Sequence, residues 1–316
     1  MQPTTFCASG NRLGSELKKN EVNVFLRGGL GNQLFQYSAG VHIASISNRN
    51  LVIREDLLPG EEDEIDGVSR FTNQLAAFNH SGVVVRNRTQ PQGATNSFGK
   101  FMQVQRMLGD YYPNFTRRMR LLAAESSSPE MSDVDLIGIR VINAYANSLE
   151  LVMKNREVLH SQIHDLRHPS AQYFALRHDL KRKAPLAVHL RLGDYANLSD
   201  IYGKISTEYL KAGIDKLSMQ GSPIWLFTRF ADEVAPEILE VLKPEFVVDE
   251  TKLKSPIENM LIMSQCKGLI CSNSTLSWWA ALLSERPDRI VVPRLKAQAN
   301  IFSKAMSHQQ WNVICG

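Results

Sequence analysis

Polar side chains with phosphate-binding chemistry follow two predicted strands, at the ends where a parallel sheet binds its ligands. Arg191 comes directly after the apolar run 186–190, with Gly193 and Asp194 next to it. The run 269–271 is followed by a hydroxyl-rich turn that opens a helix, made of Ser272, Asn273, Ser274 and Thr275. A guanidinium clamps phosphate, and the hydroxyls and backbone N–H groups of a helix N-terminus bind anions. Because the carboxyl ends of parallel strands share one edge, we expect these groups to bind one nucleotide diphosphate.

A glycine loop follows the first predicted strand, residues 22–26. The stretch RGGLGNQLFQY contains Gly28, Gly29 and Gly31, followed by Asn32 and Gln33, and we expect it to face the same cleft. A dinucleotide fingerprint is the alternative, but it requires a glycine where this chain has Leu34, although Asp56 is suitably spaced for a ribose-binding acid. Taken alone, the 272–275 turn also reads as a helix cap and Arg191 as an ion-pair partner.

Strands alternate with helices along the chain, which predicts an α/β protein with doubly wound parallel sheets. The length of 316 residues favours two domains, at 21–165 and 184–316, joined by helices spanning 148–168 and extending to 183. A strand is expected at 136–142, an acidic loop at 60–67, and no clear pattern at 69–132. The elements expected in the second half are strands 186–190, 224–227, 246–248, 269–271 and 290–292 and helices 207–219, 231–243, 256–266 and 276–285.

Composition excludes several classes of function. The net charge of +4 without a basic run argues against a nucleic-acid partner, and the four scattered cysteines indicate neither a disulfide framework nor a zinc site. Asp133-Val134-Asp135 resembles a manganese motif but precedes its strand, and His160, His164 and His168 share a helical face without further ligands. No apolar run is long enough for a signal or a span, so we expect a cytoplasmic chain, with peripheral membrane association open and the Golgi lumen as the alternative if an anchor was removed.

Three blocks of sequence together resemble a known family. GGLGNQLFQYSAG, VHLRLGDY and SNSTLSWWAALLS, in this order, are similar to the signature blocks of glycosyltransferase family 11, the α-1,2-fucosyltransferases. The likeness extends over residues 22–295, with little contribution from 56–130. It implies two facing Rossmann-like domains (GT-B type), with the donor bound mostly by the second. It also implies metal-independent, inverting transfer of L-fucose from GDP-β-L-fucose to the 2-hydroxyl of a galactose-terminated glycan, with no cofactor.

The resemblance also assigns roles to residues. His189, Arg191, Gly193 and Asp194 match the family's second block, with Arg191 as the diphosphate ligand. Residues 272–275 match its donor loop, and Gly28, Gly29, Gly31, Asn32 and Gln33 match its cleft loop. The chemistry needs a carboxylate to accept the proton of the 2-hydroxyl group. Asp194 is the first candidate, Asp249 and Glu250 are alternatives, and Asp194 also reads as a turn-forming residue that positions Arg191.

The chain departs from the family pattern in three places. Leu192 replaces a second arginine, residues 227–230 read Phe-Thr-Arg-Phe in place of Phe-Ser-Asp-Asp, and 144–147 read Ala-Tyr-Ala-Asn in place of Tyr-Phe-Gln-Ser. Arg229 is a candidate to restore the missing charge. Two alternatives therefore stay open: a fucosyltransferase of another linkage or acceptor, and a non-catalytic GDP-sugar-binding or lectin-like module.

Overall fold

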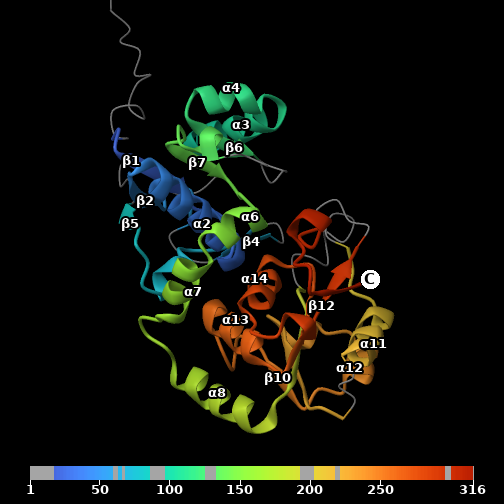
Figure 1. Cartoon of the computed structure of the whole chain (residues 1–316). Helices are drawn as coiled ribbons and strands as arrows, with labels where there is room; N and C mark the ends of the chain where they lie inside the picture. The colour runs from blue at the N-terminus through green and yellow to red at the C-terminus, as the bar shows by residue number, and fades with distance from the viewer. Residues whose placement is uncertain are drawn as a thin grey trace, which may run out of the picture.

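The computed structural model describes residues 18–59, 63–65, 68–85, 97–124, 133–192, 203–217, 221–295 and 300–315. They form two lobes, each built around a sheet of parallel strands covered by helices (Figure 1). The expected α/β architecture of two facing Rossmann-like lobes is therefore confirmed. Among the described residues, no helix is both long enough and apolar enough to cross a membrane.

The N-terminal lobe contains a five-stranded parallel sheet in the order β5-β2-β1-β7-β6. Its strands are β1 (Glu21–Phe25), β2 (Asn50–Arg54), β5 (Val83–Val85), β6 (Leu121–Ala124) and β7 (Val141–Ala144). Its helices are α2 (Leu30–Ser47), α3 (Ser97–Tyr111), α4 (Pro113–Arg118), α5 (Asp133–Leu136), α6 (Leu149–Lys154) and α7 (Arg156–His164). A short antiparallel pair, β3 (Asp63–Ile65) and β4 (Val68–Arg70), precedes the 3-10 helix η1 (Gln74–Ala77).

The C-terminal lobe contains a six-stranded sheet in the order β10-β9-β8-β11-β12-β13, which is the Rossmann order when its strands are counted from β8. Its strands are β8 (Leu186–His189), β9 (Ile224–Phe227), β10 (Phe246–Val248), β11 (Gly268–Ile270), β12 (Ile290–Arg294) and β13 (Asn312–Cys315). Its helices are α11 (Thr207–Lys216), α12 (Pro236–Leu242), α13 (Pro256–Gln265) and α14 (Thr275–Leu283), with 3-10 turns η2 (Ala231–Glu233), η3 (Pro287–Arg289) and η4 (Lys304–Met306). Helix α8 (Ala171–Lys183) leads into this lobe and packs beside α13 (Figure 1).

Several elements differ from the sequence predictions. The strand expected at 136–142 begins at Val141, because the buried residues Leu136, Ile139 and Ile142 recur every third position, which suits a turn and not a strand. The helix expected at 148–168 is divided at Asn155 and ends at His164. The acidic loop expected at 60–67 contains β3. The segment 69–132, in which no clear pattern was recognised, contains η1, β5, α3, α4 and β6. The edge strand β13 was not predicted.

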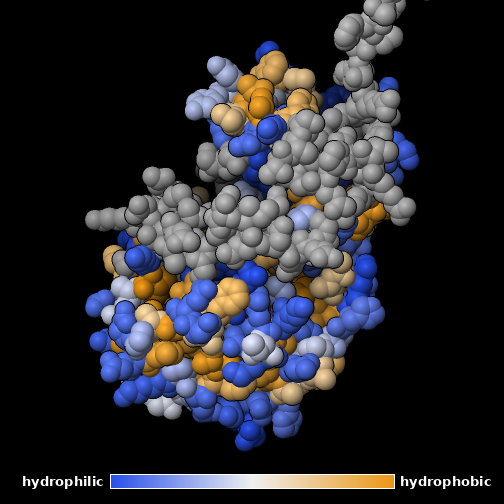
Figure 2. Space-filling model, turned by 180° about the vertical axis from the view of Figure 1, so that it is seen from behind, coloured by the Kyte–Doolittle hydropathy of each residue, from blue (hydrophilic) through white to orange (hydrophobic). Residues whose placement is uncertain are grey.

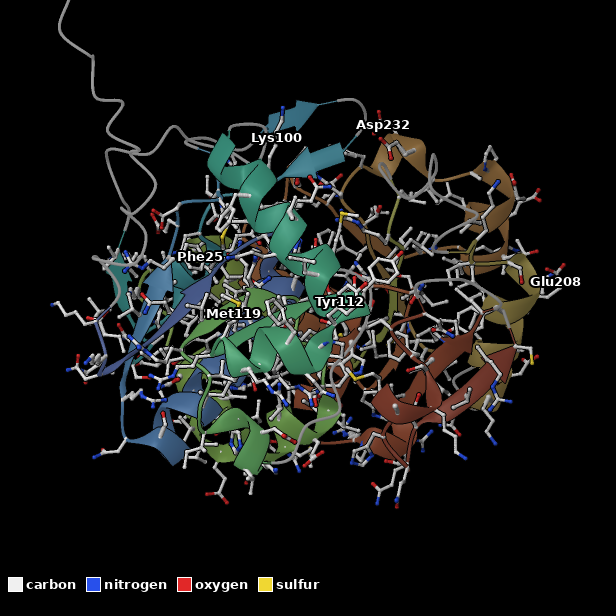
Figure 3. All side chains as sticks on the ribbon, turned by 90° about the horizontal axis from the view of Figure 1, so that it is seen from above. Phe25, Lys100, Tyr112, Met119, Glu208 and Asp232 are labelled. Carbon is white, nitrogen blue, oxygen red and sulfur yellow. The ribbon has the colours of Figure 1, made fainter. Side chains whose placement is uncertain are left out.

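One hydrophobic core joins the two lobes. It contains Val24 and Phe35 from the N-terminal lobe together with Trp278, Trp279 and Val292 from the C-terminal lobe. A second cluster covers the other face of the C-terminal sheet and includes Val188, Leu226 and Ile270. Seen from above, α3 and α4 lie on the outer side of the N-terminal lobe (Figure 3). The lobes are therefore joined by buried apolar contacts as well as by α8.

Candidate functional site

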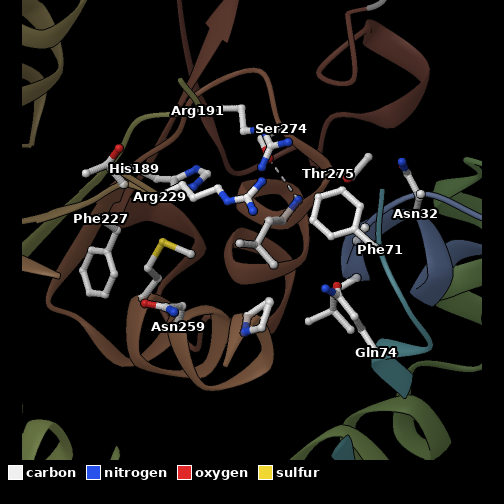
Figure 4. Close-up of a pocket in the computed structure, with 18 of the residues that line it drawn as sticks. Asn32, Phe71, Gln74, His189, Arg191, Phe227, Arg229, Asn259, Ser274 and Thr275 are labelled. Carbon is white, nitrogen blue, oxygen red and sulfur yellow. Dashed lines mark hydrogen bonds between the residues drawn. The ribbon is translucent and has the colours of Figure 1, made fainter. Parts of the chain in front are cut away.

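A cavity of about 230 Å³ lies between the lobes, at the carboxyl ends of strands from both sheets (Figure 4). In each sheet, some of the lining residues follow the two adjacent strands at which the strand order reverses. From the N-terminal lobe these are Gly28, Gly29, Leu30, Gly31 and Asn32 after β1 and Tyr145 after β7. From the C-terminal lobe they are His189, Leu190 and Arg191 at the end of β8 and Ser274, Thr275 and Leu276 after β11. Such switch points are where open α/β sheets bind ligands, and here two of them share one cavity.

Two arginines occupy equivalent positions on neighbouring strands of the C-terminal sheet. His189 pairs with Phe227 in the parallel register of β8 and β9, and the backbone N–H of Leu190 donates to the Phe227 carbonyl at 2.9 Å. Arg191 and Arg229 each lie two residues beyond that pair, and both line the cavity. Figure 4 shows both side chains directed toward the same region beside Ser274. The cleft therefore presents two guanidinium groups side by side.

Arg229 is held by a carboxylate and by aromatic rings. Its Nε donates to Oε1 of Glu250, after β10, at 2.7 Å. Its guanidinium also lies 4.9 Å from the ring centre of Phe230 and 5.8 Å from that of Phe71. An arginine packed in this way keeps its planar donors oriented toward the cleft.

Leu192 points away from this arrangement. Its partly buried side chain packs against the second hydrophobic cluster, beneath the C-terminal sheet, and it is not among the residues that line the cavity. The position at which the family pattern has a second arginine is thus filled by a core-facing leucine. The second guanidinium in the cleft comes from Arg229.

His189 is a buried, neutral imidazole. Its Nδ1 faces the hydroxyl groups of Ser272, at 3.0 Å, and of Ser277. Burial, and then the positive charge of Arg191, lower the pKa of His189 to about 3. The ring is therefore neutral at pH 7, where it keeps one N–H for hydrogen bonding and does not take up a second proton.

The first half of the 272–275 turn is hydrogen-bonded within the C-terminal lobe, and the second half lines the cavity. Ser272 contacts His189, and the side-chain carbonyl of Asn273 accepts a hydrogen bond from the backbone N–H of Ile301 at 2.9 Å. Ser274 caps α14 by accepting from the backbone N–H of Leu276, and Ser274 and Thr275 line the cavity. Only the second half of the turn is placed to contact a ligand.

The glycine loop has the same division. Gly28 has a φ of +72°, and a side chain there would meet Asn32 at 2.7 Å. A Cβ on Gly31 would lie 2.5 Å from the backbone carbon of Thr275, so this glycine allows α2 and α14 to touch across the lobes. Gln33 does not line the cavity, because its fully buried amide donates to the carbonyls of Gly28 and Thr72 and accepts from the backbone N–H of Gln74.

The candidate bases are placed differently. Gly193 and Asp194 lie outside the described residues. Glu250 lines the cavity and is the only carboxylate among the described lining residues. Asp249 does not line it, and its carboxylate accepts hydrogen bonds from Thr251 and Lys252. Burial would raise the pKa of Asp249, but these hydrogen bonds and the charge of Lys252 hold it below the ordinary value.

Several cleft residues were not identified from the sequence. Phe71 and Gln74 come from the segment after β4, where no pattern was recognised. Lys254, Asn259 and Met263 come from the loop and helix after β10. This second group could have been predicted, because it follows the carboxyl end of the predicted strand 246–248. Nothing in the local sequence marks Phe71 as a cleft residue. Tyr145 was noted only as a departure, and its ring packs 3.8 Å beneath the guanidinium of Arg27.

Two sequence patterns resemble metal sites, Asp133-Val134-Asp135 and the histidines at 160, 164 and 168, but the structure gives their side chains other surroundings. Asp133 accepts from His42 and from Lys154, each at 2.8 Å, and these partners lower its pKa. His160 and His164 are exposed, with rings stacked 4.1 Å apart, and His168 is exposed as well. Within the described part of the chain, no three His, Cys, Asp or Glu side chains are grouped so as to hold a metal ion.

The fold and the cleft define a class of protein: a two-lobed α/β protein in which the switch points of both sheets meet at one cavity lined by arginines. Comparison with known proteins identifies its family. The model of glycosyl transferase family 11 matches residues 154–315. The O-antigen biosynthesis glycosyltransferase WbnK of Escherichia coli is 24% identical over 314 residues, covering 90% of this chain and 98% of that protein.

Similar solved structures include the fucosyltransferase NodZ from Bradyrhizobium, with 14% identity, a TM-score of 0.46, and coverage of 84% of this chain and 94% of NodZ. The E. coli heptosyltransferase WaaC with ADP has 14% identity, a TM-score of 0.44, and coverage of 93% and 92%. Because the family model spans half of its length, this chain belongs to glycosyl transferase family 11.

Proposed function

We propose that this chain is an inverting fucosyltransferase that moves L-fucose from GDP-β-L-fucose to the 2-hydroxyl group of a galactose-terminated glycan. The observation that carries the proposal is the placement of Arg191 and Arg229 side by side in a cleft formed by two switch points. Membership of family 11 supports glycosyl transfer, and the role named for the E. coli relative, in O-antigen biosynthesis, supports a glycan acceptor.

In the proposed mechanism, the C-terminal lobe holds the donor diphosphate. Arg191 and Arg229 supply fixed positive charge to the phosphoryl oxygens, and Ser274 and Thr275 add donors at the N-terminus of α14. Inversion is a single displacement, so negative charge grows on the departing GDP while the sugar becomes cationic. Guanidinium groups oriented in advance stabilise that growing charge.

A carboxylate must accept the proton of the attacking hydroxyl group. Asp194 remains our first assignment, and Glu250 is the alternative that the described cleft contains. In the free protein Glu250 is paired with Arg229, and a bound diphosphate would compete with it for that guanidinium. Glu250 would then be available to a hydroxyl group of the acceptor.

The central experiment measures GDP release and product formation from GDP-fucose, with and without β-galactosides, in the presence and absence of EDTA. We expect release that depends on the acceptor, is unaffected by EDTA, and yields a product sensitive to an α-1,2-specific fucosidase. A fucosylated product resistant to that enzyme would indicate another linkage. GDP binding without turnover across the acceptor panel would indicate the non-catalytic module and overturn the proposal.

The arginine assignment needs its own variants. Arg191→Ala should lower turnover by about 10²-fold or more, as removal of a preoriented anion donor does. Arg191→Lys and Arg229→Lys should each retain only part of the activity, because lysine cannot form the bidentate contact. Arg294→Lys is the matched control, since Arg294 also ends a strand of this sheet but is exposed and outside the cavity. Equal activity of all three lysine variants would remove the diphosphate clamp from the mechanism.

The base is assigned by comparing Asp194→Asn, Glu250→Gln and Asp249→Asn. Loss of a general base typically costs about 10²–10⁴-fold in turnover. The base variant should keep its affinity for GDP while its kcat falls, and Asp249→Asn should behave like the unmodified protein. If Glu250→Gln alone loses turnover, the base is Glu250 and Asp194 has a positioning role.

A further inference from the structure

The outer surface of α3 carries apolar side chains where an exposed helix usually carries polar ones. Phe101, Val104, Leu108 and Tyr111 recur at helical spacing and are between 39% and 77% exposed. Phe115 and Met119, in α4 and just after it, continue this row with 55% and 65% exposure. These six residues form what we call the α3–α4 surface.

The opposite face of α3 packs on the sheet through one large apolar residue, Met102, together with Arg106 and Gly109. Arg106 is buried there and donates to the side-chain carbonyl of Asn143 on β7 at 3.3 Å. Gly109 lies so close to β6 that a Cβ would be 1.9 Å from the carbonyl oxygen of Ala123. These contacts fix the rotation of α3, so its apolar stripe cannot turn inward. The helix is amphipathic with its apolar side outward.

The charges around this surface are predominantly positive. Residues 97–120 contain five lysines and arginines, of which Arg106 is buried on the opposite face, and one acid, Asp110. Lys100, Arg118 and Arg120 are exposed next to the apolar side chains. Figure 2 shows hydrophobic residues gathered at the top of the N-terminal lobe with hydrophilic residues around them. Figure 3 shows Lys100 on α3, Tyr112 between α3 and α4, and Met119 just after α4.

We propose that the α3–α4 surface binds the face of a lipid bilayer that contains anionic headgroups. Aromatic and aliphatic side chains enter the boundary between headgroups and acyl chains, and basic side chains remain at headgroup level, as in interfacial amphipathic helices. Contact between two copies of this surface is disfavoured, because it would bring the basic side chains of both copies together. The inference is independent of the proposed function, since none of these residues lines the cavity.

The test is co-sedimentation of the full chain with vesicles of phosphatidylcholine alone and with vesicles containing phosphatidylglycerol. We expect binding to the anionic vesicles that weakens as salt is raised. Arg118→Glu together with Arg120→Glu should lower this binding by about 10-fold or more, because each basic side chain near an anionic surface contributes about 5-fold. Circular dichroism checks that each variant is folded.

The apolar contribution is tested by a matched pair of variants. Phe115 on α4 and Phe174 on α8 are both 55% exposed. Phe115→Ser should reduce vesicle binding by about 10-fold, as loss of a buried aromatic side chain would, whereas Phe174→Ser should not.

The proposal is overturned if the unmodified chain does not bind anionic vesicles or if the two serine variants bind equally. It is also overturned if light scattering shows a dimer that Phe115→Ser dissociates, because the surface would then contact a second copy. GDP binding by the same variants should be unchanged, which separates this test from that of the proposed function.

Discussion

The indole N–H of Trp279 donates a hydrogen bond to the carbonyl oxygen of Gly31 at 2.9 Å, across 248 residues of sequence and from one lobe to the other. Phe35 packs on both Trp278 and Trp279, with ring centres 4.7 and 5.2 Å apart. The glycine-rich block and the block with paired tryptophans therefore touch each other directly. Part of each motif joins the lobes, and the remainder lines the cleft.

Replacing Trp279 by phenylalanine removes the hydrogen bond to Gly31 and leaves a buried carbonyl without that donor. We expect the free energy of unfolding to fall by ~1–3 kcal/mol more than in the matched variant Trp225→Phe. Trp225 and Trp279 are both 1% exposed, but the indole nitrogen of Trp225 has no hydrogen-bond partner among the described residues. Denaturant unfolding of both variants measures the difference, and equal losses would show that the bond contributes nothing to stability.

Gly31→Ala should disturb the contact between α2 and α14. The new Cβ would lie 2.5 Å from the backbone of Thr275, which is too close for a van der Waals contact. We expect a loss of ~1–3 kcal/mol in stability, as for overpacked cores, together with weaker binding of GDP. Gly138→Ala is the control, because nothing lies within 4 Å of the Cβ that it would add. Full stability of Gly31→Ala would mean that the two helices separate at little cost.

The low pKa of His189 makes stability depend on pH. An imidazole has a pKa of ~6.5 in an unfolded chain, whereas that of His189 in the folded protein is about 3. Between these values the unfolded state binds more protons, so the free energy of unfolding falls as the pH is lowered below ~6.5. In His189→Gln this fall should be less steep by about 1 kcal/mol per pH unit, measured by denaturant unfolding between roughly pH 4 and 6.

The control for that experiment is His178→Gln, since His178 is an exposed residue of α8 with a side chain 82% accessible. This variant measures the effect of removing an exposed imidazole, against which the effect of His189→Gln is compared. Identical slopes for His189→Gln and the unmodified protein would contradict a buried, neutral His189. The slope is informative even if His189→Gln is less stable at every pH.

Leu192→Arg restores the residue of the family pattern, but the side chain would enter a partly buried apolar environment. Leu192 packs against the second hydrophobic cluster and not into the cleft. We therefore expect a stability loss of ~1–3 kcal/mol and no gain in transfer rate. Thermal unfolding and the GDP-release assay measure both quantities. A faster enzyme of unchanged stability would show that this position can serve the donor after all.

Much of the fold could be predicted because its strands are short apolar runs bounded by turn residues. Strands 224–227 and 246–248 were predicted with the bounds that the structure has, and α13 within one residue. The strand-end rule also brought Arg191, Ser274 and Thr275 to the same cavity as the glycine loop. These inferences needed only local pattern and the direction of parallel strands.

The remainder depended on contacts between distant parts of the chain. Gln33 reads as a ligand-facing residue of the glycine loop, yet its amide holds the backbone at Thr72 and Gln74. The run that includes Leu136 reads as a strand, but its buried positions follow the spacing of a turn. No local rule predicts which face of α3 packs inward. Arg106 and Gly109 lie on the inward face although the outward face is more apolar, and their contacts with the sheet set the orientation of the helix.

The seam at which α2 meets α14 also limits how the molecule can move. Gly31 and Thr275 both line the cavity, and the two helices pack so closely there that a Cβ on Gly31 would lie 2.5 Å from the backbone of Thr275. We therefore expect any relative rotation of the lobes to have its pivot at this contact, with small displacements beside the glycine loop and larger ones farther from it. The width of the cavity would then change least beside the glycine loop.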